Sequence, residues 1–200
     1  MSRAPDECDL AVVGGGILGL AVARELTSRH PELSAAVLEA APAVAGGQTG
    51  ANSGVIHAGI YYLPGSLKAQ LCVEGAAAMY ELCERHDIAH ERCGKVIVAR
   101  DEGELGRLDE LERRGRENGV PGLRRLTSAE IAEVEPHCRG VAALHSPNTG
   151  IVDFAAVARA LAGELSSSGT PVVTNCGIQG VRVRPGRLGL EHSLGETRAR

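Results

Sequence analysis

The feature that most constrains this chain is a glycine turn near its start, Gly14-Gly15-Gly16, followed by a further glycine at position 19. The apolar run at 9–13 precedes the turn and has the pattern of a buried parallel strand. Small and apolar residues then recur at helical spacing from Ile17 until Pro31, where proline prevents the helix from continuing. The order of strand, glycine turn and helix predicts an α/β fold.

A second apolar strand at 35–38 ends at Glu39, which follows Gly19 by twenty residues. The two strands and the helix make a βαβ unit of about thirty residues, and Glu39 completes the Rossmann dinucleotide fingerprint. Gly14 permits the tight turn, Gly16 lets the backbone approach a pyrophosphate, and Gly19 lets helix and strand pack closely. Glu39 would accept hydrogen bonds from an adenosine ribose and repel a 2′-phosphate, which disfavours NADP. The alternative is a glycine turn without a ligand and a Glu39 that faces solvent.

A long loop, residues 40–65, follows this unit and carries six glycines and several polar side chains, as is typical of a binding loop. An NAD-binding half would continue with a second helix and a third strand at this point. The loop, and a first helix whose pattern resembles that of flavoproteins, therefore favour FAD over NAD. The predicted cofactor-binding residues are Gly14, Gly16, Ile17, Leu18, Gly19, Glu39, Gln48, Thr49, Asn52, Ser53 and Gly54.

Beyond the loop, the hydrophobic pattern predicts further helices and strands. Ser66 is expected to cap a helix that runs to about His86, with Leu67, Leu71, Met79 and Leu82 among its buried positions. Thr127 and Glu130 have the spacing of a capping box for a short helix that Pro136 ends. The remaining elements are expected to be strands at 95–99, 141–144 and 172–173, helices at 103–118 and after Asp153, and a β-meander over 177–200.

Composition and charge exclude several classes of function. A net charge of −4, from 21 basic and 25 acidic residues, leaves no positive excess for a nucleic-acid backbone. Aromatic residues are only 2% of the chain, so stacking platforms for bases are lacking as well. The six cysteines are dispersed without zinc-ligand spacing, and we expect reduced, mostly buried thiols, no metal site and a cytoplasmic protein. A peripheral contact with the inner face of the membrane stays open.

Four strings of the sequence resemble one enzyme family. They are QTGANSGVIHAGIYY at 48–62, PGSLK at 64–68, CGK at 93–95 and PNTGIVD at 147–153. They resemble the L-2-hydroxyglutarate dehydrogenases and oxidases, a branch of the D-amino-acid-oxidase-like FAD family. The resemblance extends from about Asp9 to the end of the sequence. It implies FAD-dependent oxidation of a 2-hydroxy acid, with L-2-hydroxyglutarate converted to 2-oxoglutarate.

The resemblance also implies a domain organisation. Members of the family are longer than this chain, which is therefore expected to be an N-terminal part that is inactive alone. Its fold is expected to be α/β, a Rossmann-like FAD-binding βαβ domain with an inserted, incomplete α+β substrate domain. The expected segments are 1–88 for the first part of the FAD-binding domain, 89–148 for the substrate domain and 149–200 for the rest of the FAD-binding domain.

The implied reaction indicates which side chains to consider as catalytic. Oxidation of a 2-hydroxy acid removes the hydroxyl proton and passes the C2 hydride to flavin N5, so the site needs a base and groups that hold carboxylates. His57 is the candidate base, because histidine is the side chain that most readily exchanges a proton near neutral pH. Lys68 could face a substrate carboxylate, and Tyr61 or Tyr62 could offer a hydroxyl group. The alternatives are a His57 that packs against the flavin or attaches it covalently, a solvated Lys68, and tyrosines that pack in the core or a lid.

Two other functions stay open. The first is an FAD-dependent amine or glycerol-phosphate oxidoreductase with the same fold, which substrate profiling would distinguish. The second is an inactive nucleotide-binding fragment. For the favoured function, the expected partners are a small 2-hydroxy acid and an electron acceptor, which could be oxygen, a quinone or an electron-transfer protein.

Overall fold

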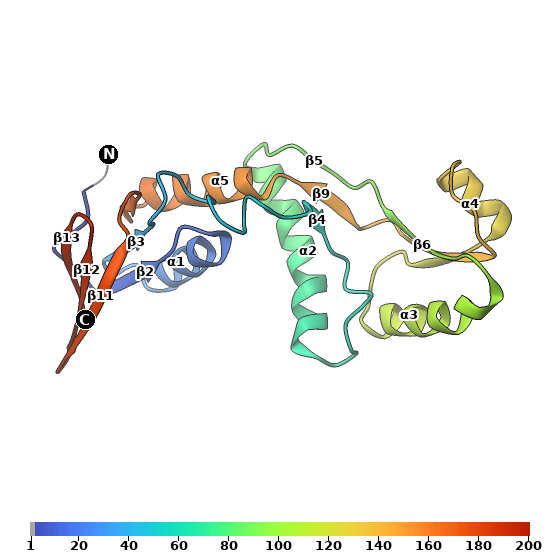
Figure 1. The fold of residues 1–200 in the computed structure, drawn as a ribbon, viewed down its shortest axis with the longest axis horizontal. Coiled ribbons are helices and arrows are strands. Elements are labelled where there is room, and N and C mark those ends of the chain that lie inside the picture. Colours follow the sequence, from blue (N-terminus) through green and yellow to red (C-terminus); the bar gives the residue numbers. More distant parts are fainter. Residues whose placement is uncertain (1–2) are drawn as a thin grey trace. The chain divides into compact units, whose positions relative to one another are not determined.

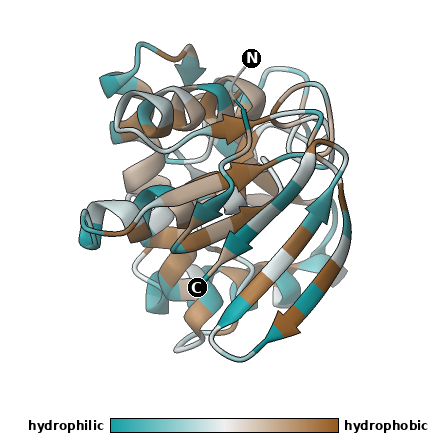
Figure 2. Ribbon diagram, turned by 90° about the vertical axis from the view of Figure 1, so that its left-hand side faces the viewer, coloured by the Kyte–Doolittle hydropathy of each residue, from teal (hydrophilic) through white to brown (hydrophobic). Residues whose placement is uncertain are grey.

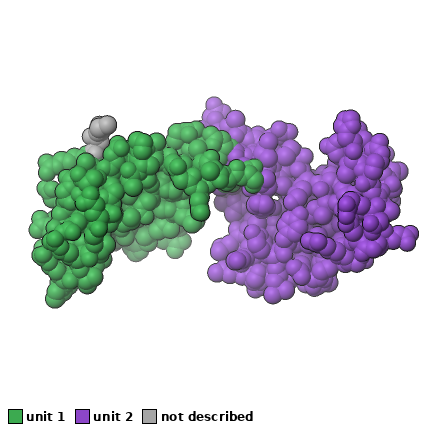
Figure 3. All heavy atoms as spheres, in the orientation of Figure 1, with its two compact units in different colours: residues 1–53, 153–200 green, residues 54–152 purple. Residues whose placement is uncertain are grey.

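The computed structural model describes residues 3–200, which form two compact units (Figure 3). The first unit contains the chain up to residue 53 together with 153–200, and the second contains 54–152. The elements of the first unit are β1 (Glu7–Cys8), β2 (Leu10–Val13), α1 (Ile17–Arg29), β3 (Ala35–Leu38), α5 (Phe154–Ser167), β10 (Val172–Val173), β11 (Ile178–Arg184), β12 (Arg187–His192) and β13 (Gly195–Ala199).

A parallel sheet of three strands, in the order β10-β3-β2, forms the centre of the first unit (Figure 1). Leu10 to Val13 pair in register with Ala35 to Leu38, and α1 connects the two strands, so the predicted βαβ unit is confirmed. Each residue of β3 is buried because this strand has a neighbour on both sides. The expectation that the first strand is buried was wrong. Since β2 lies at an edge of this sheet, its residues are only partly covered and Val13 is 58% exposed.

The two sides of β3 contribute to different parts of the first unit. Alternate residues of a strand point to opposite faces, and Ala36 and Leu38 share one face. They cluster with Val173 and with Leu190 of β12, which belongs to a second sheet. Helix α1 packs against β3 and also against α5, which buries Val157, Ala158, Leu161 and Leu165. The helix expected after Asp153 is therefore confirmed.

The C-terminal strands form the second sheet of this unit, in the order β1-β13-β12-β11. The antiparallel pairs β11 with β12 and β12 with β13 confirm the predicted β-meander. Figure 2 shows hydrophobic and hydrophilic segments alternating along these strands. Val181 and Val183 of β11 are largely exposed, at 57% and 80%. The sheet therefore covers the parallel strands with one face, through Leu190, and leaves apolar side chains on β11 in contact with solvent.

The second unit combines two small antiparallel sheets with three α-helices. Its sheets have the strand orders β4-β9-β5 and β6-β8-β7. Helix α3 buries Leu108 and Leu111 against Ile60 and Leu144, as its pattern predicts. The elements are β4 (Val55–Ile56), α2 (Leu67–Arg85), β5 (His90–Glu91), β6 (Lys95–Ala99), a 3-10 turn (Glu102–Glu104), α3 (Leu105–Glu117), β7 (Arg124–Thr127), α4 (Ser128–Val134), β8 (Ala142–Ser146) and β9 (Gly150–Val152).

The helix caps form as the sequence predicts, but α2 buries a different face from the predicted one. Ser66 accepts from the Ala69 N–H, and the capping box of Thr127 and Glu130 is formed. In α2 the predicted burial of Leu67 and Leu71 was wrong, because they are 68% and 55% exposed, and Met79 and Leu82 are only partly covered. The residues buried instead are Ala69, Tyr80 and Cys83. Gly59, which precedes α2 in the chain, lies so close to this helix that a Cβ there would meet the Val73 side chain at 2.9 Å.

The compact units differ from the domain boundaries predicted at 88/89 and 148/149. Residues 54–88 and 149–152 pack with the second unit rather than the first. The physical reason is pairing within that unit, since β4 and β5 both pair with β9, and the Tyr80 hydroxyl of α2 donates to the Asn148 carbonyl at 3.1 Å. In the structure the second unit, 54–152, interrupts the first along the chain.

All six cysteines carry free thiols, as expected. Cys8, Cys83 and Cys176 are buried, Cys72 and Cys138 are half-buried, and Cys93 is exposed. Burial raises the pKa of the Cys83 and Cys176 thiols. These buried thiols therefore stay protonated near neutral pH and pack as small apolar groups.

Candidate functional site

The glycine turn between β2 and α1 is the first candidate site. Gly14 has φ +107°, a conformation that side chains with a Cβ rarely adopt. A Cβ at Gly19 would overlap the carbonyl oxygen of Gly14, so this glycine lets α1 begin directly against the turn. At Gly16, by contrast, a Cβ would meet only the Thr49 hydroxyl, at 3.3 Å. The backbone of Gly16 is therefore open to a ligand, whereas Gly14 and Gly19 are required by the fold itself.

Glu39 lies beside this turn, at the end of β3, as the fingerprint predicts. Its carboxylate accepts a hydrogen bond from the Gly15 N–H and another from the Ala41 N–H at 2.7 Å. These two donors fix the position of the side chain. An ionised carboxylate has about four lone-pair sites, so two backbone donors leave room for two hydroxyl groups. The geometry fits a carboxylate that reads a ribose diol.

The loop after Glu39 is fastened to the same turn. The Ala45 N–H donates to the Gly15 carbonyl at 3.0 Å, and the Thr49 hydroxyl accepts from the Ile17 N–H at 3.1 Å. Thr49 therefore acts as a side-chain cap for α1, whose N-cap residue Gly16 has no side chain to do so. Among the predicted loop residues, Thr49 is the one that the structure places in contact with the turn through its side chain.

The other predicted cofactor residues are close in sequence to the turn or the loop, but they make fewer contacts. Leu18 is 80% exposed in the first turn of α1. Gln48, Asn52 and Ser53 are exposed, and the Asn52 amide donates to the Thr49 carbonyl. Gly54 belongs to the second unit, where its carbonyl accepts from the Val152 N–H at 2.8 Å and its φ is +69°.

These features fit the diphosphate and ribose of a dinucleotide. The first turn of a helix has N–H groups without partners inside the helix and a partial positive charge, both of which favour an anion. Gly16 places no side chain in front of them, although the Ile17 N–H is already bonded to the Thr49 hydroxyl. Glu39 lies at the carboxyl end of the neighbouring parallel strand, the position at which dinucleotide-binding βαβ units carry an acidic residue.

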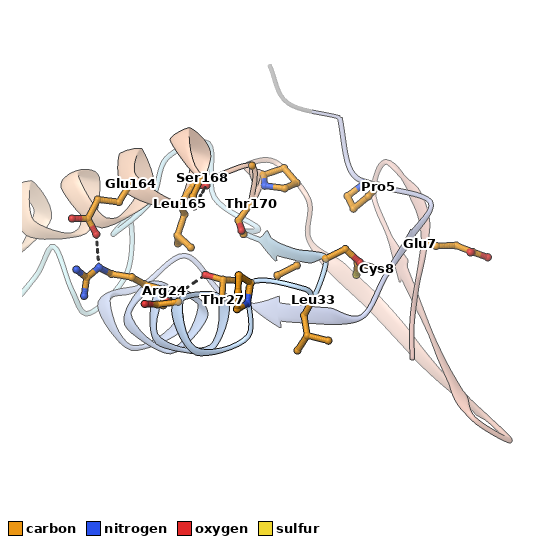
Figure 4. Close-up of a pocket in the computed structure, with 16 residues that line it drawn as sticks. Pro5, Glu7, Cys8, Arg24, Thr27, Leu33, Glu164, Leu165, Ser168 and Thr170 are labelled. Carbon is orange, nitrogen blue, oxygen red and sulfur yellow. Dashed lines mark hydrogen bonds and ion pairs between the residues drawn. The ribbon is translucent and has the colours of Figure 1, made fainter.

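A cavity of about 610 Å³ in the first unit lies away from this turn (Figure 4). It is lined by residues before β3 and β10, including Leu33 and Pro171, and hence lies at the amino ends of these strands. Ligands of open parallel sheets bind at the carboxyl ends instead. The charge of Arg24 in this cavity is already paired with Glu164. The size of the cavity therefore does not make it the nucleotide site.

The second candidate site is a small pocket in the second unit, with a volume of about 110 Å³. It brings together two predicted catalytic residues, His57 and Tyr61. Tyr61 is 43% exposed and His57 is also exposed, so both can be reached by a small molecule. The full lining is His57, Ala58, Gly59, Ile60, Tyr61, Tyr62, Lys95 and Thr149.

Hydrogen bonds to the backbone hold this pocket in shape. The Cys72 thiol donates to the His57 carbonyl at 3.3 Å, and burial raises the pKa of Cys72, which keeps this donor protonated. The Asn118 amide donates to the carbonyls of Gly59 and Tyr62, at 2.9 and 3.0 Å. Both ends of the turn that carries Tyr61 are thus fixed by one side chain from the end of α3.

The structure does not bring Lys68 into this pocket. Lys68 is exposed in the first turn of α2 and is not among the lining residues. Lys95, Thr149 and the clamp Asn118 were missed by sequence reasoning. Lys95 and Thr149 fall within two of the strings that carry the family resemblance, so a signal for them was present. For Asn118 there was none, because its role depends on the packing of α3 beside the turn.

Comparison with known proteins identifies the family to which the chain belongs. The FAD dependent oxidoreductase family model matches residues 9–200. The chain is 49% identical over 182 residues to the mitochondrial L-2-hydroxyglutarate dehydrogenase of Homo sapiens, covering 91% of this chain and 39% of that protein. It is 51% identical over 166 residues to the enzyme of the same name from Nematostella vectensis, covering 83% and 36%. The chain thus spans less than half the length of these relatives.

Solved structures share the fold. Glycine oxidase from Geobacillus kaustophilus superimposes with a TM-score of 0.85 and 26% identity, covering 98% of this chain and 54% of the other. L-alpha-glycerophosphate oxidase from Mycoplasma pneumoniae, with FAD bound, gives a TM-score of 0.88 at 24% identity, covering 98% and 53%. Since the family model covers nearly all of the sequence, including the glycine turn and the pocket of the second unit, this chain belongs to the FAD dependent oxidoreductase family.

Proposed function

We propose that the protein binds FAD and oxidises L-2-hydroxyglutarate to 2-oxoglutarate. The observation that carries this proposal is the 49% identity over 182 residues with a relative that is named for this substrate. The matched residues, 91% of the chain, include most of both compact units. The glycine turn and the small pocket support it independently, because each offers groups that the reaction needs.

The first unit supplies the groups that would hold the cofactor. The backbone around Gly16 faces the pyrophosphate, and Glu39 accepts hydrogen bonds from the adenosine ribose. Gln48, Asn52 and Ser53 are exposed polar side chains that could donate to the phosphates or to the flavin. When bound, FAD accepts the two electrons and the hydrogen that leave C2 of the substrate.

The pocket of the second unit supplies groups for the substrate. His57 takes the proton from the C2 hydroxyl group at a ring nitrogen, and its exposure lets it pass this proton to solvent afterwards. The Tyr61 hydroxyl donates a hydrogen bond to a substrate oxygen. Asn118 holds the backbone of the turn that carries Tyr61, through the carbonyls of Gly59 and Tyr62.

The decisive experiment replaces His57 in the FAD-loaded protein and measures anaerobic bleaching of the flavin by L-2-hydroxyglutarate in a stopped-flow instrument. We expect His57→Gln to retain FAD and to reduce the flavin roughly 10²- to 10⁴-fold more slowly, the range for removal of a general base. The wild-type rate should depend on one ionisation that the variant lacks. His137→Gln is the matched control, because His137 is exposed in the same unit and does not line the pocket.

Other outcomes would assign different roles. An unchanged reduction rate would make His57 a packing residue. Flavin that stays with the denatured wild-type protein, but is released from His57→Gln, would make it a covalent attachment site. Bleaching by glycerol 3-phosphate or an amino acid, and not by the hydroxy acid, would replace the proposed substrate.

The acceptor of the electrons and the location of the protein belong to the same proposal. Oxygen, a quinone and an electron-transfer protein are separated by the rate at which each reoxidises the bleached flavin. No helix in residues 3–200 has the length and apolar character needed to cross a bilayer. The relatives carry the word mitochondrial in their names. We propose a cytoplasmic location, with or without peripheral contact at the inner membrane face, which cell fractionation can test.

A further inference from the structure

Lys95 is the cation of the pocket that contains His57. It is the first residue of β6 and is half-buried, and its ammonium nitrogen lies 4.6 Å from the centroid of the Tyr61 ring. No aspartate or glutamate belongs to the lining of this pocket. The ammonium group of Lys95 therefore faces an aromatic ring and no carboxylate of the pocket lining.

The charge of Lys95 differs from most other positive charges of the unit, which are already paired. Arg113, Arg116 and Arg125 each bind one or more carboxylates of the same helical region. Within the described residues, no carboxylate lies within ion-pair distance of Lys95. Lys68 and Lys95 are the only lysines of the sequence, and the other 19 of its 21 basic residues are arginines. An unpaired ammonium in a pocket is free to bind an anion.

The structure also holds Lys95 in place before an anion arrives. The preceding Gly94 has φ +75°, and its N–H donates to the Thr149 carbonyl at 2.9 Å. Lys95 itself pairs with Ser146 across the sheet. The Tyr61 ring lies beside the ammonium group, in a turn whose Gly59 and Tyr62 carbonyls are bound by Asn118, and it limits the directions that the ammonium group can take. A charge positioned in this way loses little freedom when it forms a charge-assisted hydrogen bond.

We propose that Lys95, and not Lys68, binds a carboxylate of the 2-hydroxy acid substrate in the pocket that contains His57. This inference rests on the function proposed above. The pocket, of about 110 Å³, has room for a carboxylate group and places it beside the candidate base, His57. Lys95 then selects for anionic substrates, while His57 acts on the hydroxyl group.

The test measures binding of glutarate, a dicarboxylate without the reactive hydroxyl group, to the FAD-loaded protein by isothermal titration calorimetry. We expect Lys95→Met to weaken glutarate binding about 10- to 100-fold, as for the loss of a hydrogen bond between charged groups. Lys95→Arg should recover part of the affinity. Arg139→Met is the matched control, since it removes one exposed positive charge of the same unit outside the pocket, and its affinity should equal that of the wild type.

Kinetics provide a second readout. Lys95→Met should raise the KM for L-2-hydroxyglutarate by a similar factor while FAD content and the melting temperature stay at wild-type values. Lys95→Gln serves the same purpose if the methionine variant does not fold. An unchanged glutarate affinity in a folded Lys95 variant would overturn the proposal, as would a larger loss in Lys68→Met.

The proposed function can fail separately from this inference. If wild-type protein binds glutarate and loses it in Lys95→Met, but L-2-hydroxyglutarate does not bleach the flavin, the carboxylate site is supported and the substrate is wrong. If the hydroxy acid bleaches the flavin equally well in wild type and Lys95→Met, with equal KM and glutarate affinity, the proposed function stands and Lys95 is not the binding group.

Discussion

Alanine at Gly16 and at Gly19 should separate cofactor binding from folding. A Cβ at Gly19 would overlap the Gly14 carbonyl, a backbone atom that can move only if α1 moves away from the turn. Such overpacking costs about 1–3 kcal/mol, and the better helix propensity of alanine recovers at most about 1 kcal/mol. Gly19→Ala should therefore lower the unfolding free energy of the apoprotein, with a fall in Tm of roughly 2–4 °C for each kcal/mol lost.

Gly16→Ala should behave in the opposite way. Gly16 has φ −77° and ψ 170°, which alanine adopts without strain, and its Cβ would meet only the Thr49 hydroxyl at 3.3 Å. We expect the stability of the apoprotein to change by less than about 1 kcal/mol. The added methyl group would stand in the space that the pyrophosphate needs, so FAD should bind at least about tenfold more weakly, a loss of about 1.4 kcal/mol.

Two measurements on the same preparations separate a loss of stability from a loss of affinity for FAD. Thermal unfolding of the apoproteins reports the cost to the fold, and quenching of flavin fluorescence on titration reports the affinity for FAD. The reasoning is refuted if Gly16→Ala binds FAD as tightly as the wild type, or if Gly19→Ala melts at the wild-type temperature. Equal losses of stability in both variants would also refute it. Of these two glycines, Gly19 is the one at which a Cβ would overlap a backbone atom.

Three further predictions concern Asn118, Thr49 and Glu110. Asn118→Ala removes two hydrogen bonds to the Gly59 and Tyr62 carbonyls and should cost about 1–2 kcal/mol in urea unfolding; an unchanged midpoint would contradict the clamp. Thr49→Val removes the acceptor that caps α1 and should cost about 0.5–2 kcal/mol, whereas Thr49→Ser should retain wild-type stability. Hydrogen bonds from two arginines lower the pKa of Glu110 from 4.5 to about 2, so its contribution to stability is complete above about pH 4.5 and is lost as the pH falls towards 2. Glu110→Gln should accordingly make the unfolding free energy depend less on pH below about 4.5. An identical pH dependence in wild type and variant would exclude this linkage.

Several elements of the fold could be predicted because their signals are local. At the start of the chain, a short apolar run predicts the strand and the glycines after it predict the turn. The proline that follows predicts where the helix ends. The capping box at Thr127 and Glu130 depends on two side chains three residues apart. The position of Glu39 beside the turn also followed from the sequence, since a βαβ unit brings the ends of its two parallel strands together.

What only the tertiary structure decided depends on contacts between segments far apart in the chain. The periodicity of α2 is visible in the sequence, but the face that it buries was set by contacts with segments far away in the chain, such as that of Tyr80 with Asn148, and Leu67 and Leu71 are exposed. The unit boundary at residues 53/54 results from the pairing of β4 with β9, about a hundred residues later in sequence, which no local pattern encodes. For the same reason the sequence pointed to Lys68, near His57 in the chain, while the structure placed Lys95 in the pocket through the sheet that positions β6. Local signals determine which elements form, and long-range packing determines which side chains share a site.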